Sequence, residues 1–182
     1  GGTVVSIQTF NRDAKSLEAA SRKLAQNGDF EAVLIADNGD MAIKAAPYIR
    51  KNASETAKIL GTDLWNTSSN LAGAPSMRGA WFASVSDSLY KQYADKYRGR
   101  YGKAPFRLSS LGYDSVLLTV KVARNWKVGS PFPINQLTDK GGFIGLDGVF
   151  RFMPNGVSER ALEVQEIRTG SFAVIDPAPK GF

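Results

Sequence analysis

The stretch "EAVLIADNGDMAIKAAPYIRKN", Glu31 to Asn52, joins an uninterrupted apolar run to a segment with helical periodicity. Such a run, without alternating polar residues, is typical of a strand buried in a parallel sheet. "AKILG", Ala57 to Gly61, is a second run of this kind, and "MRGAWFASVSD", Met77 to Asp87, contains another. Strands separated by helices of this length predict βαβ units.

The residues before this stretch fit the same pattern. "TVVSIQTF", Thr3 to Phe10, is rich in β-branched and aromatic residues and predicts a strand. The helix expected after it has Asn11 and Asp13 as candidate N-caps, and Gly28 ends it. The first half of the chain is therefore predicted to be an α/β unit with a parallel sheet.

The character of the sequence changes after Asp87. Two long helices are expected, and the second, "LSSLGYDSVLLTVKVARNW", is strongly apolar. The tail then reads as strand, turn, strand, turn, strand, with Leu162, Val164 and Ile167 toward a core and Glu163 and Gln165 toward water. The predicted fold class is α/β, a three-layer Rossmann-like parallel sheet with antiparallel C-terminal strands.

Composition excludes several classes of chemistry. The 182 residues contain no cysteine and no histidine, so thiol nucleophiles, thiolate metal sites and imidazole acid–base catalysis are excluded. The net charge of +6 is spread over helix faces with acids interspersed, and no nucleic-acid motif accompanies it, so no nucleic-acid partner is expected. No signal peptide and no membrane span are expected in this chain.

A ligand site is expected where the parallel strands end. Ligands bind beyond the carboxyl ends of strands in open α/β sheets. Three polar segments lie there, "TFNRD", "ADNGDM" and "GTDLWN", and the last places Asp63 and Trp65 at the end of the "AKILG" strand. The alternatives are local: Thr62 or Asp63 as an N-cap, and Trp65 as a packed side chain.

The order of segments resembles the second half of a type I periplasmic binding protein of the Leu/Ile/Val receptor group. The resemblance covers nearly the whole chain and rests on "YRGRYGKAP", "GYDSV" and "FIGLDGVFRFMPNG", in that order. The segments "LIADNG" and "GTDLWN" most resemble the sequences of the subgroup called penicillin-binding protein activators. No cofactor is implied.

The resemblance implies roles for particular residues. Asp63 aligns with the acidic residue that pairs with a ligand's α-ammonium group, although it is one methylene shorter than the Glu of the amino-acid receptors. Asp37 and Asn38 align with a ligand-contacting loop whose usual aromatic residue is absent here. Phe10 is a further candidate contact, or equally a helix staple. Tyr113 and Asp114 correspond to a structural Gly-Tyr-Asp motif.

Family members have two α/β lobes and are about twice as long. The resemblance implies that residues 1–86 and 147–182 form lobe 2, and that residues 87–146 are helices covering a lobe 1 whose sheet is absent here. Such a segment would expose apolar surface, so a homo-oligomer is also expected.

The expected function is that of the substrate-binding component of an ABC transporter, which binds an amino acid or similar small polar solute and is not an enzyme. The alternative is an envelope interaction module of the activator type, which regulates cell-wall synthesis. The expected partners are accordingly the membrane subunits of an importer or a cell-wall synthase. The expected location is the periplasm or cell envelope.

Overall fold

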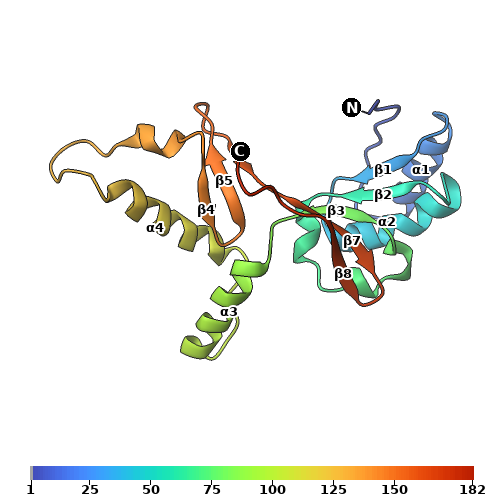
Figure 1. The fold of residues 1–182 in the computed structure, drawn as a ribbon. Coiled ribbons are helices and arrows are strands. Elements are labelled where there is room, and N and C mark those ends of the chain that lie inside the picture. The colour runs from blue at the N-terminus through green and yellow to red at the C-terminus, as the bar shows by residue number, and fades with distance from the viewer. Residues whose placement is uncertain (1) are drawn as a thin grey trace. The chain divides into compact units, whose positions relative to one another are not determined.

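The computed structural model describes residues 2–182 as two compact units (Figure 1). Unit 1 runs to Ser84 and includes Val164–Asp176, and unit 2 comprises Val85–Glu163 and Pro177–Phe182. The chain therefore passes between the units at three points. Residues 147–163 lie in unit 2, because their strands pair with each other and with the strand before them. The division of the chain into lobe 2 and a segment that covers lobe 1 stays a prediction.

Unit 1 is built on a five-stranded sheet with the order β1-β2-β3-β7-β8. β1 pairs parallel with β2, β2 pairs parallel with β3, and β7 and β8 form an antiparallel hairpin. The predicted α/β class with antiparallel C-terminal strands is thus confirmed. The strands are β1 (Ala32–Ile35), β2 (Lys58–Gly61), β3 (Trp81–Ser84), β7 (Glu163–Arg168) and β8 (Ser171–Asp176).

Capped helices cover this sheet. Asp13 caps α1 (Ala14–Ala25) by accepting the Ser16 N–H at 2.8 Å, as predicted. Asn38 caps α2 (Gly39–Asn52), which contains Pro47. Three short 3₁₀ helices follow β2: η1 (Asp63–Thr67), η2 (Leu71–Gly73) and η3 (Pro75–Met77).

The core of unit 1 lies on one face of the sheet. Ile59 and Phe82 are 0–1% exposed there and form one cluster with Leu17 of α1 and the apolar residues of α2. The opposite face carries a row in register, Leu34, Leu60 and Trp81, of which Leu34 is 59% exposed. Both long helices of unit 1 contribute to this cluster.

Two strand predictions were wrong. Thr3–Phe10 is not a strand, and Ile7 is 81% exposed, because β propensity forms a strand only where a partner satisfies the backbone groups. Glu163 and Gln165 do not face water: both are buried on the same face of β7 as Ile167. β7 lies between β3 and β8, so the face it turns to the core is set by the sheet rather than by polarity.

Unit 2 contains two helices and a small antiparallel sheet of order β4-β5-β6. Its core is a cluster of Leu118, Val122, Phe143 and Phe150 between the second helix and the sheet. The elements are α3 (Ser88–Tyr101), α4 (Ser109–Ala123), η4 (Ile134–Thr138), β4 (Phe143–Gly145), β5 (Gly148–Phe152) and β6 (Ser158–Arg160).

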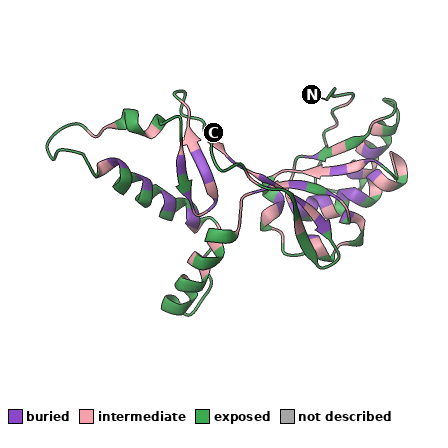
Figure 2. Ribbon diagram, in the orientation of Figure 1, coloured by how far each residue is buried: buried purple, intermediate pink, exposed green. Residues whose placement is uncertain are grey.

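α4 is apolar on two faces, and only one of them is covered. Leu118 and Val122 are buried, whereas the apolar side chains on the opposite side, Tyr113, Val116, Leu117 and Val120, are 44–64% exposed (Figure 2). A helix that is hydrophobic all round is normally enclosed on all sides. No helix within residues 2–182 is long and apolar enough to cross a membrane.

Candidate functional site

The carboxyl ends of β1 and β2 bring the predicted residues of unit 1 together. Ile35 and Gly61 are register partners at the ends of these parallel strands. Asp37 therefore follows β1 at the same edge of the sheet where Asp63 follows β2. The two segments are also joined directly, because the Trp65 Nε1–H donates to the Asp37 carbonyl oxygen at 3.0 Å.

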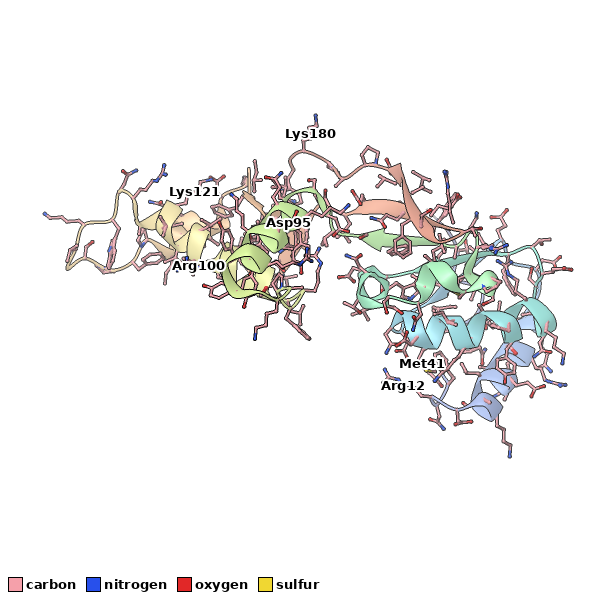
Figure 3. The ribbon with its side chains drawn as sticks, turned by 90° about the horizontal axis from the view of Figure 1, so that it is seen from below. Arg12, Met41, Asp95, Arg100, Lys121 and Lys180 are labelled. Carbon is pink, nitrogen blue, oxygen red and sulfur yellow. The ribbon has the colours of Figure 1, made fainter. Side chains whose placement is uncertain are left out.

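The carboxylate of Asp37 is already engaged. Arg12 Nη2 lies 2.9 Å from Oδ1 and its Nε lies 3.3 Å from Oδ2, while the Asn38 N–H donates to Oδ1 at 2.7 Å. The Asp37 side chain is only 13% exposed. Figure 3 shows Arg12 beside the first turn of α2, where Met41 lies. Arg12 belongs to the "TFNRD" segment that was expected at this edge, but it was not named as a site residue, because no local signal links it to Asp37.

Asn38 and Phe10 have structural contacts. The Asn38 Oδ1 accepts the Met41 N–H at 3.0 Å and so caps α2. Phe10 is half-buried and packs against the core of unit 1. Both residues therefore stabilise the chain segments around the strand ends.

Trp65 is enclosed. It is 0% exposed, its ring centroid lies 6.0 Å from that of Phe82, and it covers Gly61 so closely that a Cβ there would lie 2.2 Å from the ring. Gly61 is thus required by this contact, since any larger residue would displace the indole. Trp65 is therefore a packed core side chain, which was the alternative interpretation of this residue.

Asp63 differs from the other four residues. It is the first residue of η1, it is exposed, and within residues 2–182 no hydrogen bond or ion pair engages its carboxylate. Thr62 precedes it, and the Thr62 Oγ1 is buried with no hydrogen-bond partner among the described residues. The exposed carboxylate of Asp63 can accept hydrogen bonds from a cationic group.

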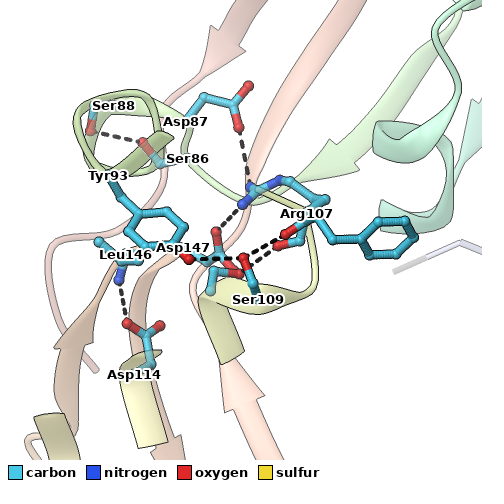
Figure 4. A network of polar contacts seen from close by, with 11 residues as sticks. Ser86, Asp87, Ser88, Tyr93, Arg107, Ser109, Asp114, Leu146 and Asp147 are labelled. Atoms are coloured by element: carbon cyan, nitrogen blue, oxygen red, sulfur yellow. Dashed lines mark hydrogen bonds and ion pairs between the residues drawn. The ribbon is translucent and has the colours of Figure 1, made fainter. Parts of the chain in front are cut away.

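Unit 2 contains a polar cluster that was missed from the sequence (Figure 4). Arg107 pairs with Asp87, at 3.2 Å, and with Asp147, and its guanidinium lies 3.8 Å from the ring centroid of Tyr90. The Ser110 hydroxyl donates to Asp147 at 2.6 Å. These five residues come from three segments that are far apart in the sequence, so no local sequence signal indicates the cluster. The cluster joins the start of α3, the start of α4 and the β4–β5 turn.

Asp114 is held nearby in unit 2 by the backbone. Its Oδ1 accepts the Leu146 N–H at 2.8 Å, and it lies so close to Gly145 that a Cβ there would be 2.2 Å from Oδ2. The side chain is 3% exposed, and Oδ2 has no partner among the described residues. Burial raises the pKa of this carboxyl group, and the neighbouring Asp147 carboxylate adds to the effect.

The carboxylate side chains of the described residues do not form a metal centre. No group of three or more Asp or Glu side chains within residues 2–182 is arranged to hold a metal ion.

The fold of this chain is shared with proteins of known structure. No protein-family model matches the chain, and no curated protein matches it. A solved structure of a candidate branched-chain amino acid ABC transporter from Rhodospirillum rubrum matches 96% of this chain and 53% of its own, with 22% identity and a TM-score of 0.74.

Two further structures are similar. The leucine binding protein LivK from Thermotoga maritima matches 94% of this chain and 51% of its own, with 22% identity and a TM-score of 0.62. The C-domain of LpoA from Haemophilus influenzae, a regulator of PBP1A, matches 87% and 49%, with 18% identity and a TM-score of 0.60.

The chain spans about half the length of these solved structures. The similarity confirms the predicted fold, that of the type I periplasmic binding proteins. At these identities it concerns the fold alone.

Proposed function

We propose that this chain is the ligand-contacting half of a non-enzymatic solute-binding protein, and that Asp63 binds the ammonium group of an amino acid or a similar small polar solute. The observation that carries the proposal is the free, exposed carboxylate of Asp63 at the carboxyl end of β2, in a fold shared with amino-acid-binding proteins. Asp37, Asn38, Phe10 and Trp65 form the framework around it.

The chemistry of Asp63 suits this role. A carboxylate accepts charge-assisted hydrogen bonds from an ammonium group, and it has no competing partner to release first. In the proposed mechanism the ligand joins this half to a second lobe and so selects the closed arrangement. The partners are then the membrane subunits of an ABC importer, and the location is the periplasm or cell envelope.

The test is a titration of the isotope-labelled chain with L-leucine, L-glutamate and glycine, followed by NMR. Amide shifts are expected at residues 61–66 and 37–39 at millimolar amino acid, because half of a site binds weakly. Asp63→Asn should abolish the shifts, since it removes the charge and keeps the shape. Asp29→Asn, at an exposed carboxylate of the same unit, should leave them unchanged. Absence of shifts in the native chain would contradict the proposal.

The alternative function is an envelope interaction module that regulates a cell-wall synthase without a ligand. The closed packing of Trp65 and the existing ion pair of Asp37 favour it, because both side chains are already engaged within the described part of the chain. The fold similarity to the LpoA C-domain also supports it. Biolayer interferometry with a purified penicillin-binding cell-wall synthase tests it. Binding that survives Asp63→Asn, in the absence of amino-acid shifts, would favour this alternative.

A further inference from the structure

The net charge of the chain lies in one unit. Unit 1 contains ten lysine and arginine residues and ten aspartate and glutamate residues, so its formal charges cancel. Unit 2 contains thirteen basic and seven acidic residues, so the whole excess of +6 belongs to it. Such an asymmetry between two parts of a chain is typical of a protein whose basic part meets an anionic partner.

The charge of unit 2 is densest on α3 and in the two residues that follow it. Residues 88–103 contain five cations and a single acid, Asp95, which pairs with Arg98 at 3.5 Å. The five cations, here called the α3 surface, are Lys91, Lys96, Arg98, Arg100 and Lys103. All five are exposed, and within residues 2–182 no ion pair engages the four cations other than Arg98. The helix itself has no buried residue (Figure 2).

The exposure of the α3 surface follows from its chemistry. Lysine and arginine side chains are almost never fully buried unless they are paired. These cations therefore stay in water whatever else packs against the apolar side chains of unit 2. A surface of net charge +4 over sixteen residues attracts anions at any ionic strength that leaves it unscreened.

A stripe of aromatic rings runs between the cations. Four tyrosines spaced three or four residues apart form it: Tyr90, Tyr93, Tyr97 and Tyr101. Helical geometry puts two cations on each flank of the stripe, Lys91 and Arg98 on one and Lys96 and Arg100 on the other. Tyrosine rings and cations are the side chains that favour the boundary between a bilayer and water, because the ring is apolar and its hydroxyl stays hydrated.

The rings are already engaged with one another. Neighbouring rings of the stripe have centroids 4.5–6.0 Å apart, and Tyr93 also lies 5.2 Å from Tyr113. Proteins that bind single-stranded nucleic acid stack its bases on free ring faces. The stripe therefore suits a lipid surface better than a nucleic acid.

We propose that the α3 surface binds the face of an anionic phospholipid bilayer. The lipid phosphates pair with the cations that have no acidic partner, and Tyr101, which is 54% exposed, lies at the boundary with the headgroups. Each cation near such a surface strengthens binding about fivefold, so four of them give weak, reversible attachment that salt weakens. The proposal is independent of the function of Asp63.

Cosedimentation of the whole chain with vesicles tests the proposal. One set of vesicles contains phosphatidylcholine alone, and the other contains equal parts of phosphatidylcholine and phosphatidylglycerol. At roughly 30 mM salt the chain should pellet with the anionic vesicles and remain in solution with the zwitterionic ones. At roughly 500 mM salt it should remain in solution with both.

Two triple variants of equal net charge locate the surface. The first replaces three lysines of the α3 surface: Lys91→Gln, Lys96→Gln and Lys103→Gln. It should weaken binding to the anionic vesicles on the order of 100-fold. The matched control replaces three exposed lysines of unit 1: Lys15→Gln, Lys44→Gln and Lys51→Gln. It should bind like the native chain, and both variants should keep the native urea midpoint because every substituted side chain is exposed.

Three results would overturn the proposal. The first is a native chain that does not pellet with the anionic vesicles at low salt. The second is an equal loss in the two triple variants, which would show that total charge rather than the α3 surface determines binding. The third is equally tight binding to single-stranded DNA or to poly-L-glutamate at the same salt, since the surface would then recognise any polyanion rather than a lipid bilayer.

Discussion

The two units differ in how completely they are packed. Unit 1 encloses several large side chains completely, with Trp65, Leu71 and Met77 at 0% exposure. Unit 2 has a core of four buried apolar residues, and its longest helix, α4, leaves an apolar face exposed. In unit 1 the stabilising contacts are apolar and dense, whereas unit 2 depends more on a few polar residues that tie separate segments together.

The comparison teaches where a single substitution should matter. Free energy lost from a dense apolar core scales with the removed volume. Free energy lost from a sparse unit depends on whether a buried charge is left without its partner.

The largest effect is expected for Trp65→Ala. Removing an enclosed indole should lower the free energy of unfolding of unit 1 by about 3–5 kcal/mol. Trp126→Ala in unit 2 is the matched control, because Trp126 is 38% exposed, and it should cost less than about 2 kcal/mol. Urea denaturation with hydrogen exchange on each unit measures both. Equal costs would break the comparison.

A smaller effect is expected for Arg107→Met. The Asp147 side chain is only 7% exposed, and the variant leaves it with Ser110 but without its cation. Unit 2 should lose about 2–4 kcal/mol of unfolding free energy. Arg98→Met is the control, since the Arg98–Asp95 pair is exposed on both sides and should contribute less than about 1 kcal/mol. A loss as small as that of the control would show that the cluster does not hold unit 2 together.

The smallest effect concerns pH. Because burial raises the pKa of Asp114, the folded state holds this proton more tightly than the unfolded state does. Its contribution to stability is thus fully present below the ordinary pKa of an aspartate and is lost as the pH rises through the raised value.

Asp114→Asn cannot titrate and should flatten this part of the pH profile of unit 2, with a change within about 1 kcal/mol at neutral pH. Asp95→Asn, at an exposed aspartate of the same unit, should leave the profile of the native chain unchanged. Urea midpoints across the acid range measure the difference, and an unchanged slope in Asp114→Asn would contradict the assignment.

Much of the candidate site was predictable from the order of strands. Parallel strands end at the same sheet edge, so the polar residues after "AVLI" and "AKIL" had to lie near one another, and Asp37 and Asp63 do. Whether each of these side chains is buried, paired or free was not predictable from the order of strands. Arg12 engages Asp37 from a loop 25 residues away, and Arg107 reaches Asp147 across 40 residues.

The sequence by itself determined the class of fold, the capped helices and the antiparallel tail, because apolar periodicity, cap residues and turn residues act over a few positions. Tertiary structure decided the rest. It left Thr3–Phe10 without a partner strand, turned Glu163 and Gln165 inward, enclosed Trp65 and left Asp63 free. The physical reason is that pairing and burial depend on which surfaces meet, and those surfaces come from segments far apart in the chain.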